Sequence, residues 1–178
     1  MIRRLGENDI DTLMELRHEA LVSEPSAFGS SPDDDVGLDP DFLRRIMRDP
    51  STQGVFGATD DGLVGMEGVY REPKGKRAHK AEVWGMYVRR AHRRRGYGKA
   101  LTAAGLEFAR FLPGVTHLHL SVSETAGPAR RLYESLGFET WGIEPASLVV
   151  DGKPIATRHM LLRLETSGGA GDFRGGLG

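Results

Sequence analysis

The stretch RRAHRRRGYGK, from Arg89 to Lys99, places five arginines and a lysine within eleven residues and sets two glycines among them. It follows a run of strand-forming residues, KAEVWGMYV (80–88). The apolar residues of the segment after it recur at helical spacing: Tyr97, Leu101, Ala104, Phe108 and Phe111. A junction between a strand and a long helix presents free backbone N–H groups at the positive end of the helix dipole. The stretch therefore predicts an anion site, at which glycine at 96 and 98 lets a phosphate approach the backbone.

A nucleic-acid-binding face is the alternative interpretation of these arginines. The whole chain of 178 residues carries a formal net charge of −1, so it has no global basic field to hold a polyanion. Such a module also needs exposed aromatics interleaved with basic residues over a wide face, and only Tyr97 lies nearby. We therefore expect a local anion site and no nucleic-acid partner.

Composition is that of a single globular domain, with 39% hydrophobic residues and no cysteine. The lack of cysteine excludes disulfides, thiolate nucleophiles and cysteine-based zinc sites. No apolar run reaches the ~18 residues of a membrane span, and the start MIRRLGENDIDTL has no apolar stretch typical of a secretory signal. We expect a cytoplasmic protein with no membrane partner.

Periodicity and turn residues predict an α/β fold over residues 1–165. Strand patterns lie at the N-terminus, on both sides of Asp60-Asp61-Gly62, at 80–88, at VTHLHLSVS (115–123) and on both sides of Asp151-Gly152. Helical patterns are ENDIDTLMELRHEAL (7–21), DPDFLRRIM (39–47), 97–111 and GPARRLYESLG (127–137). The first of these carries Arg17 as the one polar member of its apolar stripe, and Asn8 or Asp9 can cap it. Residues 166–178 are glycine-rich, and we expect them to be disordered.

Two spaced motifs connect the anion site with a second segment. The pattern V88-x-R-x-x-R93-x-x-G96-x-G98 is followed, about thirty residues later, by A129-x-x-L132-Y133-x-x-x-G137-F138. Together they closely resemble motifs A and B of the Gcn5-related N-acetyltransferase (GNAT) family. The resemblance implies a mixed, mostly antiparallel sheet of about seven strands, splayed at one strand and flanked by about four helices. It also implies acetyl transfer from acetyl-CoA to a primary amine, without a metal.

The resemblance further implies which residues bind acetyl-CoA. The amides from Arg94 to Lys99 would hold the pyrophosphate, and the strand through Tyr87 would pair with the pantetheine arm. The residues that we expect to bind the cofactor are Met86, Tyr87, Val88, Arg93, Arg94, Arg95, Gly96, Tyr97, Gly98, Lys99 and Ala129.

Catalysis of this transfer needs a neutral amine, a donor to the developing oxyanion and a proton for the departing thiolate. Tyr133 matches the family's usual general acid, although a tyrosine at helical spacing can also simply pack in the core. Glu82 is the best candidate for the base, because its position matches the glutamate that some members use through a water, although it can also pair with Lys80 or Arg71. His117 and His119, on one face of the next strand, are alternative bases or half-buried structural residues. They lack a convincing third ligand, so we expect no metal site.

Two positions depart from the family pattern. Ala126 stands where an asparagine is common, so a side-chain contact with the pantetheine arm is lost, for which Ser123 and Thr125 are the candidate replacements, and Arg90 stands where a proline is usual. The alternative function is a non-catalytic CoA-binding sensor or interaction module on the same fold. The first helix, the loop SEPSAFGSSPDDD (23–35) and the strands from Trp141 to Val150 would form the acceptor walls; the acceptor's identity and a homodimer stay open.

Overall fold

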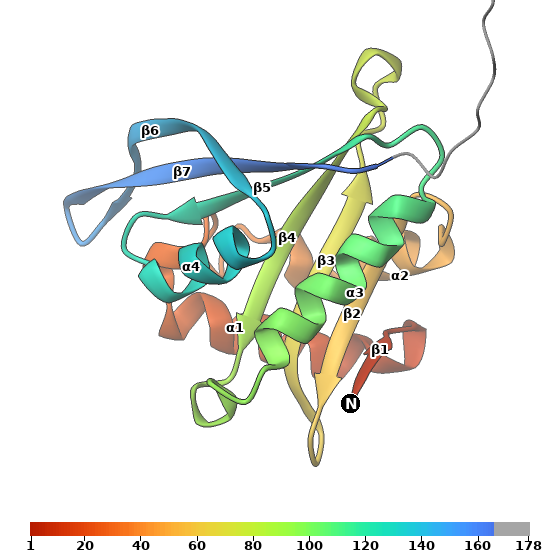
Figure 1. The fold of residues 1–178 in the computed structure, drawn as a ribbon. Helices are drawn as coiled ribbons and strands as arrows, with labels where there is room; N and C mark the ends of the chain where they lie inside the picture. Colours follow the sequence, from red (N-terminus) through yellow and green to blue (C-terminus); the bar gives the residue numbers. More distant parts are fainter. Residues whose placement is uncertain (166–178) are drawn as a thin grey trace, which may run out of the picture.

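The computed structural model describes residues 1–165, so the expectation of a disordered tail falls on 166–178, outside the described residues. Within 1–165 the chain forms one seven-stranded sheet, as the family resemblance implies, in the order β1-β2-β3-β4-β5-β7-β6 (Figure 1). The strands are β1 (Ile2–Arg4), β2 (Gln53–Thr59), β3 (Leu63–Arg71), β4 (Lys80–Val88), β5 (His117–Ser123), β6 (Glu139–Val150) and β7 (Lys153–Arg163). All neighbouring strands are antiparallel except β4 and β5.

Four α-helices cover the described sheet on both faces (Figure 1). They are α1 (Ile10–Ser23), α2 (Pro40–Arg48), α3 (Tyr97–Phe111) and α4 (Gly127–Ser135). One apolar cluster joins α1 and α2 to residues such as Met66 and Tyr87, and a second joins α3 and α4 to residues such as Val69 and Leu118. The central strands β3 and β4 thus bury apolar side chains against both helix layers.

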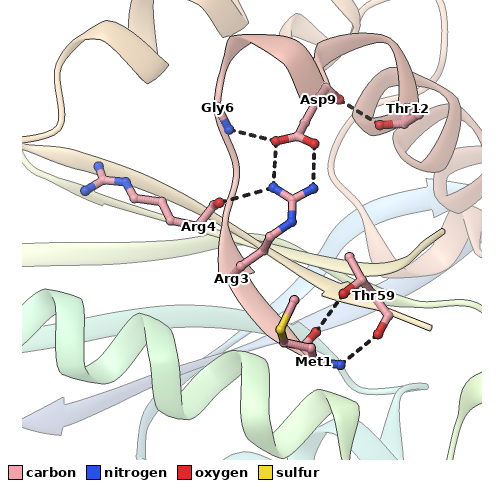
Figure 2. Close-up of polar contacts among 7 residues, drawn as sticks. All are labelled: Met1, Arg3, Arg4, Gly6, Asp9, Thr12 and Thr59. Carbon is pink, nitrogen blue, oxygen red and sulfur yellow. Dashed lines mark hydrogen bonds and ion pairs between the residues drawn. The ribbon is translucent and has the colours of Figure 1, made fainter. Parts of the chain in front are cut away.

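The short strand β1 is fixed at the sheet edge by polar contacts (Figure 2). The two terminal guanidinium nitrogens of Arg3, Nη1 and Nη2, donate to the Asp9 carboxylate at 2.8 and 2.6 Å. The same carboxylate accepts from the Gly6 amide at 2.9 Å, and the Met1 ammonium donates to the Thr59 carbonyl at 2.7 Å. Asp9 is the N-cap residue of α1, as predicted, but its side chain makes no capping bond to that helix; it holds the entry turn to β1 instead.

The strands β4 and β5 are paired over only three residues and then separate. Their register runs from Lys80 opposite His117 to Glu82 opposite His119. Beyond these residues the two described strands do not pair with each other. Figure 1 shows the two strands diverging toward α4. The predicted splay is therefore present, and it leaves one edge of β4 from residue 83 onward without a strand partner.

The turns fall where the sequence places them. Asp61 and Gly62 have φ of +52° and +106° between β2 and β3, and Asp151 and Gly152 have φ of +50° and +73° between β6 and β7. Such left-handed pairs suit the twist of two-stranded hairpins. The predicted apolar stripe of α3 is partly wrong, because Phe111 is 82% exposed. The buried face is displaced to include Thr102 and Gly105, which lie against β3.

No helix among the described residues is long and apolar enough to cross a membrane.

Candidate active site

A β-bulge in β4 shapes the point where the sheet opens. Met66 of β3 lies opposite Tyr87, but Gly68 lies opposite Trp84, so β4 holds one extra residue at 85–86. Gly85 takes a φ of +67°, which glycine adopts without strain. The bulge turns Met86 toward the α3 layer and leaves Tyr87 on the α1 layer. Gly85 therefore marks a β-bulge, as the sequence suggested.

A cavity of about 100 Å³ lies between the separated strands. Its walls are residues 83–86 of β4, 120–123 of β5, Ala126, Ala129 and Tyr133 at α4, and Ala27 and Phe28 from the loop after α1. The structure thus brings together Met86, Ala129 and Tyr133, three of the predicted site residues, at one cavity. Ser123 also lines the cavity beside Ala126, and its hydroxyl is hydrogen-bonded to the Thr125 hydroxyl at 2.8 Å.

The start of α3 offers free N–H groups near this cavity. Gly96 is its N-cap with φ +83°, and the first helical bond of the turn is from the Ala100 amide to the Gly96 carbonyl at 3.0 Å. The amides of Tyr97, Gly98 and Lys99 therefore have no acceptor within the helix. A Cβ on Gly96 would meet no atom within 4 Å, so the turn faces open space. These free amides are what the predicted anion cradle requires, and their binding of an anion stays a prediction.

Gly98 also has a packing role that its sequence context did not indicate. A Cβ there would lie 3.0 Å from Cε of Met86 and 3.2 Å from Cδ2 of Leu132. The missing side chain therefore lets α3 pack closely against β4 and α4. That it also lets a phosphate approach the backbone stays a prediction.

The predicted arginines divide into two groups. Arg93 donates to the Val88 carbonyl at 2.9 Å and pairs with Glu24 at 2.8 Å, while Arg95 pairs with Asp60 at 3.2 Å. These two side chains fix the loop against α1 and the β2–β3 turn. Arg94 has φ +62°, a conformation that belongs to the strained turn before the helix. The side chains of Arg93 and Arg95 thus have partners within the protein, while anion binding by this turn stays a prediction.

The Tyr87 side chain points away from the cavity, into the α1 layer. Its hydroxyl donates to Glu19 at 3.0 Å, and Arg89 donates to the other oxygen of that carboxylate at 2.9 Å. Only the backbone of Tyr87 and Val88 lies along the free edge of β4. Their predicted role in cofactor binding is therefore limited to main-chain contacts.

Tyr133 is 5% exposed and packs edge-on against Phe138, yet its ring also lines the cavity. Burial, and to a smaller degree the nearby Glu67, raises the pKa of its phenol above the ordinary value of 10.0. No hydrogen bond of its hydroxyl occurs among the described residues. The core-packing and catalytic interpretations are thus compatible, because one side of the ring packs while the residue borders the cavity.

Glu82 lies at the last pair of β4 and β5, where the strands separate. Its neighbours Ala81 and Val83 belong to the α3–α4 core, so strand alternation places its side chain on the opposite face from Tyr133. Burial first, then the negative charge of Glu72, raises the pKa of its carboxyl. Among the described residues Glu82 forms no ion pair with Lys80 or Arg71. The guanidinium of Arg71 donates to the Ala78 carbonyl instead.

The two histidines of β5 are on the same face as Glu82. Burial, assisted by the charge of Lys80, lowers the pKa of His119 to about 4. Burial also lowers the pKa of His117, whose Nδ1 contacts Thr116 at 2.8 Å. A base so weak removes a proton from an amine poorly, which favours Glu82. No group of three metal-ligating side chains is found in the described part of the chain.

Sequence reasoning missed two buried charged residues beside the bulge. Arg17 of α1 pairs with Asp35, and Glu67 of β3 is fully buried beneath α3. Arg17 stood out as the one polar member of an apolar stripe, and that signal was available. Glu67 gave none, because LVGMEGVYR is typical of a strand with a solvated carboxylate.

A second pocket, of about 510 Å³, adjoins the first at Phe28. It lies between the loop after α1, at 28–32 with Asp34, and residues 147–151 of the β6–β7 hairpin. These are the segments expected to form acceptor walls. Of the acidic residues in that loop, Glu24 and Asp35 are already paired with arginines.

Comparisons with known proteins agree on one family. The profile of the acetyltransferase (GNAT) family matches residues 13–138. A mycothiol acetyltransferase of Acidothermus cellulolyticus is 36% identical over an alignment of 135 residues, and the match covers 66% of this chain and 40% of that protein. The chain spans less than half the length of the mycothiol acetyltransferases that it matches most extensively.

Solved structures share the fold. The putative acetyltransferase yncA of Salmonella typhimurium, solved with acetyl-CoA, has a TM-score of 0.80 at 21% identity and covers 93% of this chain and 94% of its own. A phosphinothricin acetyltransferase of Sinorhizobium meliloti, in complex with AcCoA, has a TM-score of 0.81 at 18% identity, with 92% and 88% covered.

Proposed function

Because the chain belongs to the GNAT family of acetyltransferases, we propose that it transfers an acetyl group from acetyl-CoA to a primary amine by direct attack on the thioester. The observation that carries this proposal is the meeting of three features at one point of the sheet. They are the unpaired edge of β4, the cavity bordered by Tyr133 and the free amides at the start of α3. The acceptor remains part of the proposal, since the relatives extend well beyond this chain.

The donor fits the groups that the chain presents. Phosphate oxygens are matched by the free amides of Tyr97, Gly98 and Lys99 and by the positive end of α3. The pantetheine arm is an extended chain of amides, and it would add to β4 along residues 86–88 as an extra strand does. Backbone N–H groups around Tyr87 and Val88 would donate to the thioester oxygen as it gains negative charge.

Tyr133 acts on the leaving sulfur in this proposal. Its raised pKa keeps the phenol protonated across the working pH range, so it can always donate a hydrogen bond. The same burial makes a thiolate in the cavity more basic, which preserves the driving force for proton transfer from the phenol. The residue thereby stabilises the departing thiolate without needing to ionise beforehand.

Glu82 acts on the incoming amine. A typical alkylamine is protonated at neutral pH and cannot attack until a proton is removed. The raised pKa of the Glu82 carboxyl makes it a stronger base than an exposed carboxylate, and its place on the face opposite Tyr133 suits an amine that arrives as the thiol leaves. A water would connect it to the amine.

The acceptor would enter through the second pocket and reach the cavity past Phe28. The name of the relatives, mycothiol acetyltransferase, favours a small molecule over a protein acceptor. Hydroxyls of Ser30 and Ser147 and the carboxyl of Asp151 make the pocket suited to a polar molecule. We infer a polar, low-molecular-weight amine.

The test is thiol release from acetyl-CoA with a panel of an alkylamine, an amino-acid amide, a polyamine, an aminoglycoside and a lysine peptide. Release with at least one amine, absent without enzyme, supports the proposal. Tight CoA binding with no release for any amine would identify the non-catalytic sensor. DNA binding at about 150 mM salt without CoA binding would restore the nucleic-acid interpretation.

A further inference from the structure

Arg17 of α1 is a buried guanidinium that the proposed mechanism does not use. Its side chain is 8% exposed, and its partner Asp35 is 5% exposed. Nε and Nη2 donate to the two oxygens of Asp35, at 3.0 and 2.6 Å. The ring of Phe28 stacks on the guanidinium, with Cζ 4.6 Å from its centroid. The cation is thus neutralised and held in one orientation.

The third nitrogen of this guanidinium is free. Nη1 is buried and has no hydrogen-bond partner among the described residues. Leaving a buried, charged N–H without an acceptor is unfavourable, because the group has lost its water and gained no partner. The remaining contacts of Asp35, from the Ser30 hydroxyl and the Gly37 amide, hold the pair in place and do not reach Nη1. The arrangement therefore keeps one donor unused at a measurable cost.

Nη1 points at the bulge of β4. A Cβ built on Gly85 would lie 3.7 Å from Nη1 and would meet no other heavy atom within 4 Å beyond its chain neighbours. Gly85 and Phe28 both line the cavity bordered by Tyr133. The side of Gly85 that carries no Cβ is therefore bounded by a fixed N–H donor of the α1 layer, from which the amine would arrive.

We propose that Nη1 of Arg17 binds a neutral carbonyl oxygen next to the reacting amine, which makes α-amino carbonyl compounds, such as aminoacyl amides, the preferred acceptors. This inference rests on the proposed acetyl transfer. A carboxylate fits less well, because it would bring a second negative charge beside Asp35. In an α-amino amide the carbonyl oxygen lies about 3 Å from the amine nitrogen. A hydrogen bond from Nη1 to this oxygen would therefore also position the amine.

The test compares alaninamide with isopropylamine, which has a methyl group in place of the carboxamide, in the parent and in Arg17→Lys. Lysine retains a cation for Asp35 but has no second nitrogen to direct at Gly85. We expect the ratio of kcat/KM for alaninamide over isopropylamine to fall about 10- to 100-fold, as for one lost charged hydrogen bond. The differing basicity of the amines cancels because the same pair is used with both proteins. Arg44→Lys, on an exposed part of α2, is the matched control and should keep the parent's ratio.

A second measurement needs no variant. N-acetylalaninamide and N-isopropylacetamide are uncharged product analogues that differ in the same group, and we expect the first to inhibit the parent at least ~10-fold more tightly. Equal inhibition, or an unchanged ratio in Arg17→Lys with both amines acetylated, overturns this inference and leaves acetyl transfer standing. A preference for alanine over alaninamide also overturns it, in favour of a carboxylate. Failure of every amine to release thiol overturns both proposals.

Discussion

The substitution Glu67→Gln should destabilise the protein at acidic pH and stabilise it at alkaline pH. Glu67 is fully buried, and its Oε2 accepts from the Thr102 hydroxyl at 2.8 Å. Its Oε1 has no partner among the described residues and would lie 2.4 Å from a Cβ on Gly105. The carboxyl is thus enclosed between β3 and α3, with one weak polar contact.

Burial raises the pKa of Glu67 from 4.5 to about 8. The folded state therefore holds this proton in a pH range where the unfolded chain releases it, so the free energy of unfolding falls as pH rises from about 4.5 to about 8 and then levels off. Each pKa unit corresponds to about 1.4 kcal/mol, so the loss between pH 5 and 8 is about 4 kcal/mol. This is a large part of the stability of an ordinary domain, ~5–15 kcal/mol.

Glutamine cannot ionise, so the variant lacks this loss. Below about pH 5 it should be less stable than the parent by about 1–3 kcal/mol, because its NH₂ group has no acceptor where Oε1 lies. Near pH 8 it should be more stable than the parent by a similar amount. Urea unfolding from pH 5 to 9, followed by the fluorescence of Trp84 and Trp141, measures the crossing.

Glu107→Gln on α3 is the matched control, since it removes an exposed carboxylate and leaves Glu67 untouched. A difference between Glu67→Gln and the parent that stays within about 1 kcal/mol over the whole range would refute the reasoning. It would mean that water or another group solvates the Glu67 carboxyl in the folded state.

Three further predictions concern the site. Tyr133→Phe keeps the packing against Phe138, so CoA affinity by calorimetry should hold while turnover falls about 10²-fold; turnover within about twofold would return Tyr133 to a packing role. The acidic limb of the kcat/KM profile should lie above the ordinary carboxyl range, because the pKa of Glu82 is raised, and Glu82→Gln should abolish it; a limb that persists would point to another base. Gly96→Ala should destabilise the fold by about 1–2 kcal/mol, since φ is +83°, and weaken CoA binding about 10-fold by tilting the cradle amides. Gly75→Ala, with open space and no strained φ, is its control, and equal effects of the two would dismiss the cradle.

Local sequence signals were sufficient where the chemistry itself is local. Asp39 caps α2 by accepting from the Asp41 amide at 2.9 Å, and Gly137 ends the α4 segment with φ +90°, both as the residue types predict. Because each of these features depends on a few neighbouring residues, no knowledge of distant contacts is needed. The two spaced motifs then identified which fold such elements build.

Contacts between distant segments escaped the same reasoning. Trp84 fills the space that Gly68 leaves, since a Cβ on Gly68 would lie 2.1 Å from the indole. The pairing of Arg17 with Asp35 spans a loop without periodicity, and Phe111 is exposed although it continues a helical apolar spacing. Such placements depend on which faces of α3 and α1 the sheet covers, and that is decided by packing and not by the local pattern.

Unsatisfied polar atoms concentrate where the sheet opens. Five buried side-chain atoms of the described residues have no hydrogen-bond partner, and three of them belong to Arg17, Glu67 and His119. Arg17 faces Gly85, Glu67 lies opposite the bulge in the β3–β4 ladder, and His119 is in register with Glu82. Elsewhere, pairs such as Arg158 with Glu124 satisfy their groups within the chain. The other two atoms belong to His92 and Arg130. The Glu67 oxygen is enclosed between β3 and α3, so of the atoms beside the bulge it is the Arg17 donor for which a ligand that accepts a hydrogen bond would recover the cost of the missing partner.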